Sequence, residues 1–76
     1  MSQAELIVQG LGGRSNIVEV EACITRLRTE VADVSLVDEQ ALKSAGVHGV
    51  MKAGSVVQVV VGPDADVLAS KIEDLL

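Results

Sequence analysis

The sequence predicts an α+β fold, a four-stranded antiparallel sheet with three helices packed on one face, as a single domain over residues 1–76. First, 14 of the 76 residues are valine, and they gather in segments where apolar and polar residues alternate, as in half-buried strands. Second, three other segments place apolar residues at helical spacing. Third, the order is helix, two strands, helix, two strands, helix, and strands that come in adjacent pairs favour antiparallel pairing. A chain of 76 residues is too short for two domains.

The three predicted helices are delimited by residues typical of helix ends. The first spans residues 3–10 and is stopped by Gly12 and Gly13. The second follows Ser35–Asp38, in which either Ser35 or Asp38 is the cap, and it stops at Gly46. The third begins at residues 62–64, with Pro63 at the first helical position. The apolar positions are Leu6, Ile7 and Leu11 in the first helix, Ala41, Leu42 and Ala45 in the second, and Ala65, Leu68, Ala69, Ile72 and Leu75 in the third.

Four strands are predicted, at residues 17–22, 25–31, 50–53 and 56–61. In the first strand, Val18, Val20 and Ala22 share one face, with two glutamates on the other. No standard two-residue turn is recognisable after this strand, so the reversal is inferred only from the alternation that resumes at residue 25. The side of the sheet away from the helices is expected to carry Arg26, Arg28 and Gln58.

Composition excludes several classes of function. The formal net charge is -5 and there is no Phe, Trp or Tyr, so the chain lacks the positive charge and stacking surfaces of most nucleic-acid binders. No apolar run reaches the ~20 residues that span a bilayer, and no signal-peptide pattern is visible, so neither membrane insertion nor secretion is expected. The lone cysteine fits a reducing cytoplasm, and one Cys with one His is too few for structural zinc. No cofactor or metal is predicted.

Cys23 is the main candidate for chemistry. A lone cysteine is most commonly a small buried hydrophobic residue, and that interpretation stays open. However, Cys23 lies at a break in the strand pattern and two arginines follow closely; positive charge near a thiol favours the reactive thiolate. Arg26 and Arg28 share one strand face, where two guanidinium groups suit a dianion such as phosphate. The alternative is a pair of solvated arginines balanced by neighbouring glutamates.

Other candidate groups give weaker signals. Alternation does not decide whether the Thr25 hydroxyl contacts a phosphate or points into the core. His48 lies in a glycine-flanked segment, and we expect a surface loop histidine rather than a partner of Cys23. Gly12-Gly13 lacks the basic and hydroxyl residues of a nucleotide-binding loop, so it is interpreted as a helix stop.

The motif Cys23-Ile24-Thr25-Arg26-Leu27-Arg28 resembles the phosphorylation site of enzyme IIB (EIIB) domains of the bacterial sugar phosphotransferase system, glucose/N-acetylglucosamine family. The resemblance extends over residues 6–76, and the family fold agrees with the predicted one. Small departures are Glu21, where the family commonly has Asp, and Thr29, where it frequently has an apolar residue. Further matching segments are Gly12-Gly13, Asn16-Ile17, Val31-Ala32-Asp33, Val37-Asp38, Leu42-Lys43, Gly49-Val50, Ala53-Gly54-Ser55 and Val57-Gln58.

The resemblance implies a phosphocysteine carrier, and hence a phosphotransferase that uses no cofactor. Cys23 would accept a phosphoryl group from a phosphohistidine of enzyme IIA (EIIA) and pass it to a sugar, glucose or N-acetylglucosamine, bound by the membrane enzyme IIC (EIIC). Arg26 and Arg28 would stabilise charge, and the backbone N–H groups of Ile24 and Thr25 would bind the phosphoryl oxygens. Such a protein would be cytoplasmic and associated with the inner face of the membrane through EIIC.

A second class of function is also consistent with the residues. The chain would then be a small non-enzymatic binding or regulatory module in which Cys23 is structural or redox-sensing. Labelling of Cys23 by an upstream phosphorelay separates the two hypotheses.

Overall fold

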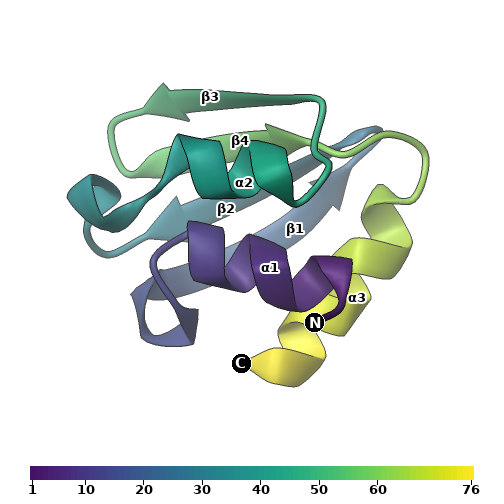
Figure 1. The fold of residues 1–76 in the computed structure, drawn as a ribbon, viewed down its shortest axis with the longest axis horizontal. Coiled ribbons are helices and arrows are strands. Elements are labelled where there is room, and N and C mark those ends of the chain that lie inside the picture. The colour runs from purple at the N-terminus through teal and green to yellow at the C-terminus, as the bar shows by residue number, and fades with distance from the viewer.

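The computed structural model describes all 76 residues and has the predicted α+β architecture (Figure 1). Four strands form one antiparallel sheet in the order β1-β2-β4-β3. The elements in chain order are α1 (Gln3–Gly10), the 3-10 helix η1 (Arg14–Asn16), β1 (Ile17–Cys23), β2 (Arg26–Val31), the 3-10 helix η2 (Val34–Leu36), α2 (Glu39–Ser44), β3 (Gly49–Ala53), β4 (Val56–Val60) and α3 (Ala65–Leu75).

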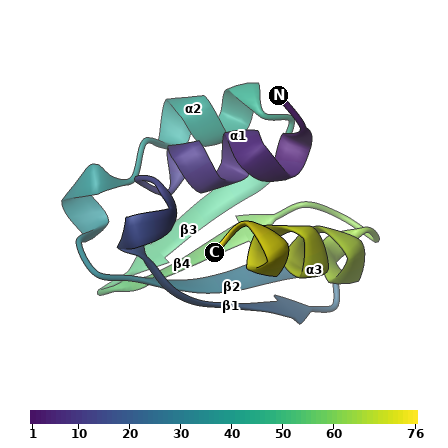
Figure 2. The same cartoon turned by 90° about the horizontal axis from the view of Figure 1, so that it is seen from below.

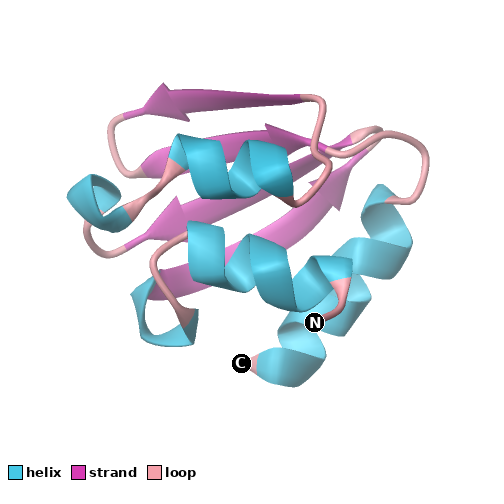
Figure 3. Cartoon of the chain, viewed as in Figure 1, coloured by secondary structure: helices cyan, strands magenta, loops and turns pink.

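All three α-helices cover one face of the sheet, as predicted. In Figure 2 the helices lie on one side of the strands, with α1 and α2 side by side and α3 over β1 and β2. Figure 3 shows the helices in front of the four strands, and the edge-on view in Figure 2 shows no element on the other side of the sheet. The other sheet face, which we call the helix-free face, is therefore open to other molecules.

The core between the layers is aliphatic. The side chains that are fully buried in it include Ile7, Leu27, Leu42 and Ile72, one from each of four elements. Two buried residues are polar, Asn16 and Thr29; Thr29 is fully buried, and its hydroxyl donates a hydrogen bond to the Val57 carbonyl oxygen at 2.7 Å. A buried hydroxyl with a partner costs little, so Thr29 fits a sheet that faces an apolar core.

The observed helix ends agree only in part with those predicted from the sequence. Asp38, rather than Ser35, caps α2, because its carboxylate accepts a hydrogen bond from the Ala41 N–H at 3.1 Å. Pro63 precedes the N-cap Asp64 instead of occupying the first helical position, since α3 begins only at Ala65. A capping box between Ser2 and Glu5 starts α1 and was not predicted.

The expected position of Val18 is wrong. The register of β1 against β2 shifts between Ile17 and Glu19, which marks a β-bulge with Val18 as the extra residue. Val18 is consequently 60% exposed, whereas Val20 is buried. The bulge also interrupts the exposed edge of β1, which discourages pairing with another strand.

Asn16 joins two segments at the end of the sheet opposite the β1–β2 turn. Its side chain is buried and donates to the carbonyl oxygens of Leu11 at 2.7 Å and Asp33 at 3.0 Å. Its amide oxygen accepts a hydrogen bond from the Asp33 N–H at 2.8 Å. The loop after α1 is thus fixed to the loop after β2, and both ends of the β1–β2 pair are held in place.

Candidate functional site

Cys23 lies at the end of β1, where the chain reverses into β2. Cys23 and Arg26 are cross-strand partners, and only Ile24 and Thr25 lie between them. The connection is therefore a two-residue hairpin turn, which confirms the reversal inferred from the alternation, although no such turn was recognisable in the sequence. The sequence concealed it because these turns are usually recognised by Asn-Gly, Asp-Gly or Gly, none of which is present.

Ile24 adopts a backbone conformation that is unusual for its residue type. Its φ is 60°, and it is the only non-glycine residue with positive φ in the chain. Left-handed geometry is unfavourable for a β-branched residue, yet tight hairpin turns require it. The Ile24 side chain is 89% exposed, so no burial offsets the strain. Strained backbone of this kind is typical of functional sites.

The turn is fastened to the segment that joins β4 to α3. The Thr25 carbonyl oxygen accepts hydrogen bonds from the N–H groups of Val61 at 2.9 Å and Gly62 at 3.0 Å. The positive φ of Gly62, 93°, allows the chain to turn there. The Thr25 side chain is exposed, which decides the alternative left open by the sequence: it does not point into the core.

The Cys23 thiol is free and exposed. The interpretation of Cys23 as a small buried hydrophobic residue is therefore wrong. Because direct cross-strand partners lie on the same face of a sheet, Cys23 shares the helix-free face with Arg26. Their Cα atoms are roughly 4.5–5.5 Å apart, as in any antiparallel pair. An exposed nucleophile beside a guanidinium can meet an anionic reactant carried by another protein.

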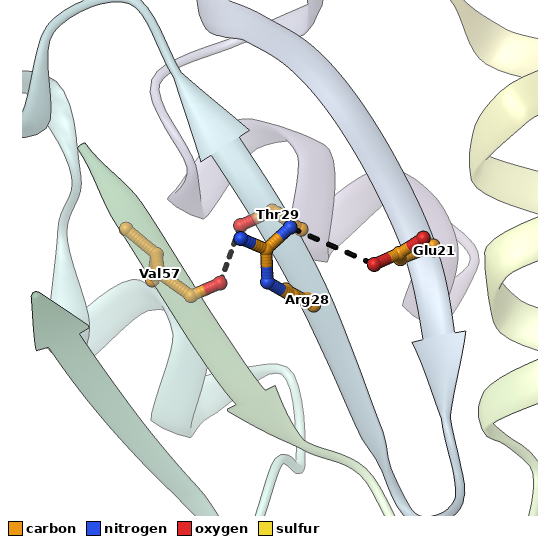
Figure 4. Close-up of polar contacts among 4 residues, drawn as sticks. All are labelled: Glu21, Arg28, Thr29 and Val57. Atoms are coloured by element: carbon orange, nitrogen blue, oxygen red, sulfur yellow. Dashed lines mark hydrogen bonds and ion pairs between the residues drawn. The ribbon is translucent and has the colours of Figure 1, made fainter.

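Arg26 and Arg28 both lie on the helix-free face, as the alternation predicts, but their partners differ. Figure 4 shows Arg28 directed toward Glu21 on β1, and the closest Nη1···Oε1 distance is 3.6 Å. Arg26 instead donates from Nη1 to the Oε1 of Gln58 on β4 at 3.1 Å. The interpretation of both arginines as balanced by glutamates thus holds for Arg28 and not for Arg26, which has no carboxylate partner.

His48 is exposed, as expected for a surface loop histidine. Its backbone N–H donates to the Val60 carbonyl oxygen at 2.7 Å, which holds the residue just before β3. Its ring lies beside Gly62, and no hydrogen bond links it to Cys23. His48 and Cys23 therefore do not form a hydrogen-bonded pair in the structure.

The surface around Cys23 is not a pocket. Two hollows exist, of about 260 and 330 Å³, and neither is lined by Cys23, Arg26 or Arg28. No group of three His, Cys, Asp or Glu side chains could hold a metal ion. None of the helices is both long and apolar enough to cross a bilayer. Cys23, Arg26 and Arg28 thus lie on an open surface rather than in a cavity.

Two contacts of the site were not predicted, those of Gln58 and of the Thr25 carbonyl oxygen. The sequence did mark Gln58 as unusual, because it is the only polar residue in the run from Val56 to Val61. Its side chain shares the face of Arg26 because the two residues are diagonal neighbours, Gln58 being the direct partner of Arg28. No sequence pattern marks the Thr25 contact, since it involves backbone atoms alone.

Comparison with known proteins provides close relatives. The model of the family described as phosphotransferase system, EIIB, matches residues 5–38. The chain is 63% identical over 75 residues to the N-acetylglucosamine-specific EIIB component of the phosphotransferase system (PTS) of Streptomyces coelicolor, covering 99% of this chain and 97% of that protein. The family model thus includes Cys23 and both arginines.

Other relatives are longer. The chain is 47% identical to the glucose-specific EIICBA component of Streptococcus pneumoniae, covering 99% of this chain but 10% of that protein. It is 44% identical to the N-acetylglucosamine-specific EIICB component of Bacillus subtilis, covering 88% of this chain and 15% of that protein.

Among solved structures, one domain of the PTS IIabc component from Clostridium difficile has a similar fold. The TM-score is 0.75 at 23% sequence identity, over 95% of this chain and 73% of that one. This likeness supports the fold alone.

Proposed function

This chain belongs to the EIIB family of the sugar phosphotransferase system, whose members are phosphotransferases that act in sugar uptake, and we propose that Cys23 is the residue that carries its phosphoryl group. The observation that supports this proposal is the exposed thiol at the strand end, paired across β1 and β2 with Arg26. Residues 1–76 would act as one phosphocarrier domain.

In the first step, the Cys23 thiolate attacks the phosphorus of a phosphohistidine on EIIA. The S–P bond forms as the N–P bond breaks, and the histidine nitrogen leaves with the electron pair of that bond. Attack from an open surface suits a donor that is itself a protein, because nothing around Cys23 has to be displaced. The N–H groups of Ile24 and Thr25 are the proposed donors to the phosphoryl oxygens, since tight reversals present successive N–H groups to anions.

In the second step, a sugar hydroxyl oxygen attacks the phosphorus of phosphocysteine. The O–P bond forms, the S–P bond breaks, and the thiolate leaves with the electron pair while the hydroxyl proton passes to a base or to solvent. Arg26 and Arg28 are proposed to stabilise the charge on the transferring group, because phosphoryl transfer depends mainly on positioning and electrostatics. Their planar forks suit the phosphoryl oxygens.

The sugar is proposed to be bound by EIIC. No pocket adjoins Cys23, so the acceptor has to be presented by another molecule. The longer relatives are named as EIICB and EIICBA components, so their names join EIIB with EIIC, or with EIIC and EIIA. This supports EIIC and EIIA as partners. Through EIIC the domain would sit at the inner, cytoplasmic face of the membrane.

N-acetylglucosamine is the sugar we propose, with glucose as the second candidate. The relative from Streptomyces coelicolor, 63% identical over nearly the full length of both chains, is named for N-acetylglucosamine. The relative from Streptococcus pneumoniae, 47% identical, is named for glucose.

The proposal is tested by intact-mass analysis after incubation with phosphoenolpyruvate and the upstream phosphorelay. We expect the mass to rise by one PO₃ group, site mapping to place the group on Cys23, and Cys23→Ser to abolish it. His48→Gln is the matched control, because His48 is the only histidine and hence the other residue that a relay could phosphorylate. A label that persists in Cys23→Ser, or a wild-type chain that takes none, would overturn the proposal. Ready oxidation of an unlabelled Cys23 would instead indicate a redox role.

A further inference from the structure

The two arginines of the site are held by chemically different partners. Arg28 faces a carboxylate, that of Glu21, at 3.6 Å. Arg26 faces the neutral amide oxygen of Gln58 at 3.1 Å. The two partners lie on opposite sides of β2, since Glu21 is on β1 and Gln58 is on β4.

The two partners have different effects on charge. A nearby carboxylate offsets part of the positive charge of its arginine, whereas a neutral amide oxygen accepts a hydrogen bond and contributes no negative charge. A guanidinium has five N–H donors, so the bond to Gln58 leaves most of those of Arg26 for an incoming anion. Of the two arginines, Arg26 is thus the one with uncompensated charge, and it is also the cross-strand partner of Cys23.

The register explains why Gln58 is needed. Arg26 has Glu21 as its diagonal neighbour on β1, because Glu21 pairs with Arg28 and Cys23 pairs with Arg26. Diagonal neighbours in a sheet are within reach of long side chains. Without an acceptor on the β4 side, Arg26 is free to lean toward Glu21. Gln58 is half-buried on the central strand β4, and its amide oxygen is the acceptor that Arg26 contacts on that side.

We propose that Gln58 is a positioning residue for phosphoryl transfer, holding Arg26 on the β4 side of the helix-free face so that its charge stays unpaired beside Cys23. This inference rests on the proposed function of Cys23. It goes beyond that function by assigning a role to a side chain that neither reacts nor contacts the thiol. The competing explanation is that the hydrogen bond is an exposed surface contact with no consequence for the reaction.

The decisive variant is Gln58→Glu, which keeps the shape of the side chain and replaces its neutral acceptor with a carboxylate. Gln40→Glu on α2 is the matched control, because Gln40 is exposed, makes no side-chain hydrogen bond, and undergoes the same change of charge. The readout is a single-turnover rate: phosphorylated chain is mixed with membrane vesicles that contain EIIC, and transfer to N-acetylglucosamine is followed. Circular dichroism establishes that each variant is folded.

We expect Gln58→Glu to lower the transfer rate by about tenfold, because a new carboxylate cancels charge that the transition state uses. Gln40→Glu is expected to transfer at the wild-type rate. In an Arg26→Gln background, Gln58→Glu is expected to cause a clearly smaller loss, since the part that acts through Arg26 is gone and only its effect on Arg28, the direct cross-strand partner of Gln58, remains. A merely structural role would not produce this dependence on Arg26.

Two results would overturn the inference: a wild-type transfer rate in Gln58→Glu, or an equal loss from Gln58→Glu with and without Arg26. Either result leaves the proposed function untouched, provided that the wild-type chain is labelled on Cys23. If the wild-type chain takes no label, the proposed function itself fails, and the two failures are therefore distinguishable.

Discussion

Cys23 and Arg26 form the last cross-strand pair of the β1–β2 hairpin, so the thiol and the base of a guanidinium side chain emerge from the same face of the sheet. The pairing is fixed by backbone geometry, whereas the guanidinium itself is held by Gln58. The thiol and the guanidinium to which we assign its stabilisation are thereby positioned by different elements of the fold.

Arg26→Lys is predicted to slow transfer from phosphorylated Cys23 to sugar by about 10- to 100-fold while the chain stays folded. A lysine keeps the charge, but it cannot donate two parallel hydrogen bonds to phosphoryl oxygens as a planar guanidinium does. The measurement is the single-turnover rate of transfer to N-acetylglucosamine, with circular dichroism as the check on folding. The appropriate comparison is Lys71→Arg on α3, a similar exchange at an exposed position. Full transfer by Arg26→Lys would show that a positive charge at this position is sufficient and that the paired hydrogen bonds of the guanidinium are not required.

Ile24→Asn is predicted to raise the free energy of unfolding by about 0.5–1.5 kcal/mol. Ile24 has a φ of 60° and is 89% exposed, so the substitution relieves backbone strain and gives up little burial. Asparagine adopts left-handed geometry far more readily than a β-branched residue. Urea denaturation monitored by circular dichroism measures the change.

Ile24→Val serves as the control for this prediction, because valine keeps the β-branch and should leave stability nearly unchanged. Destabilisation by Ile24→Asn would show that the turn is not strained. If the substitution stabilises the fold and slows phosphoryl acceptance, the strain belongs to the function of the site, as is common where stability and activity are in conflict.

The hairpin also illustrates how far a sequence predicts this fold. The periods of two and 3.6 located the three α-helices and the strands β1, β2 and β4, because burial of one face imposes them on the residues. The short strand β3 was predicted without such a period, and neither of its faces is buried. The periods failed at Val18 and at Ile24, where the backbone departs from regular geometry. A bulge adds one residue without changing composition, and a strained turn contains none of the usual turn residues. The candidate residues Cys23, Arg26 and Arg28 were found from spacing, but their different partners depend on strands that are distant in sequence.

Asn16→Ala is predicted to lower the free energy of unfolding by about 2–4 kcal/mol. The side chain is buried and makes three hydrogen bonds, two of them to Asp33, so truncation leaves several buried backbone groups without a partner. Sequence alone gave no sign of this role, because the partners lie 5 and 17 residues away. Chemical denaturation of Asn16→Ala and of Ser15→Ala, an exposed neighbour, provides the comparison. A loss no larger than that of Ser15→Ala would show that water replaces the amide.

The last prediction concerns pH. Asp33 accepts hydrogen bonds from the Ser35 hydroxyl at 2.6 Å and from the Ser35 N–H at 3.0 Å, and these, the hydroxyl first, hold the pKa of Asp33 below its usual value. Glu5 behaves similarly, because the hydrogen bond that its carboxylate accepts from the Ser2 backbone N–H at 3.0 Å, and then the interaction with the Ser2 side chain, lower the pKa of the Glu5 carboxyl. In the unfolded chain these bonds are absent and both carboxyls titrate near pH 4.

The direction of the effect follows from linkage. A carboxyl whose pKa is lower in the folded state adds stability that is complete above the unfolded pKa and is lost as the pH falls through the folded pKa. We therefore expect the chain to lose stability below about pH 4. Ser35→Ala should raise the pKa of Asp33 and weaken this part of the pH dependence.

Carbon-13 NMR titration of the Asp33 carboxyl in the wild-type and Ser35→Ala chains measures the pKa directly, and urea midpoints at neutral and acidic pH measure its consequence. Ser44→Ala is the matched control, because Ser44 is exposed and its side chain makes no hydrogen bond. If the Asp33 titration is the same in Ser35→Ala as in wild type, the Ser35 hydroxyl does not hold the carboxylate, and the acid sensitivity has to be assigned to other groups, Glu5 first.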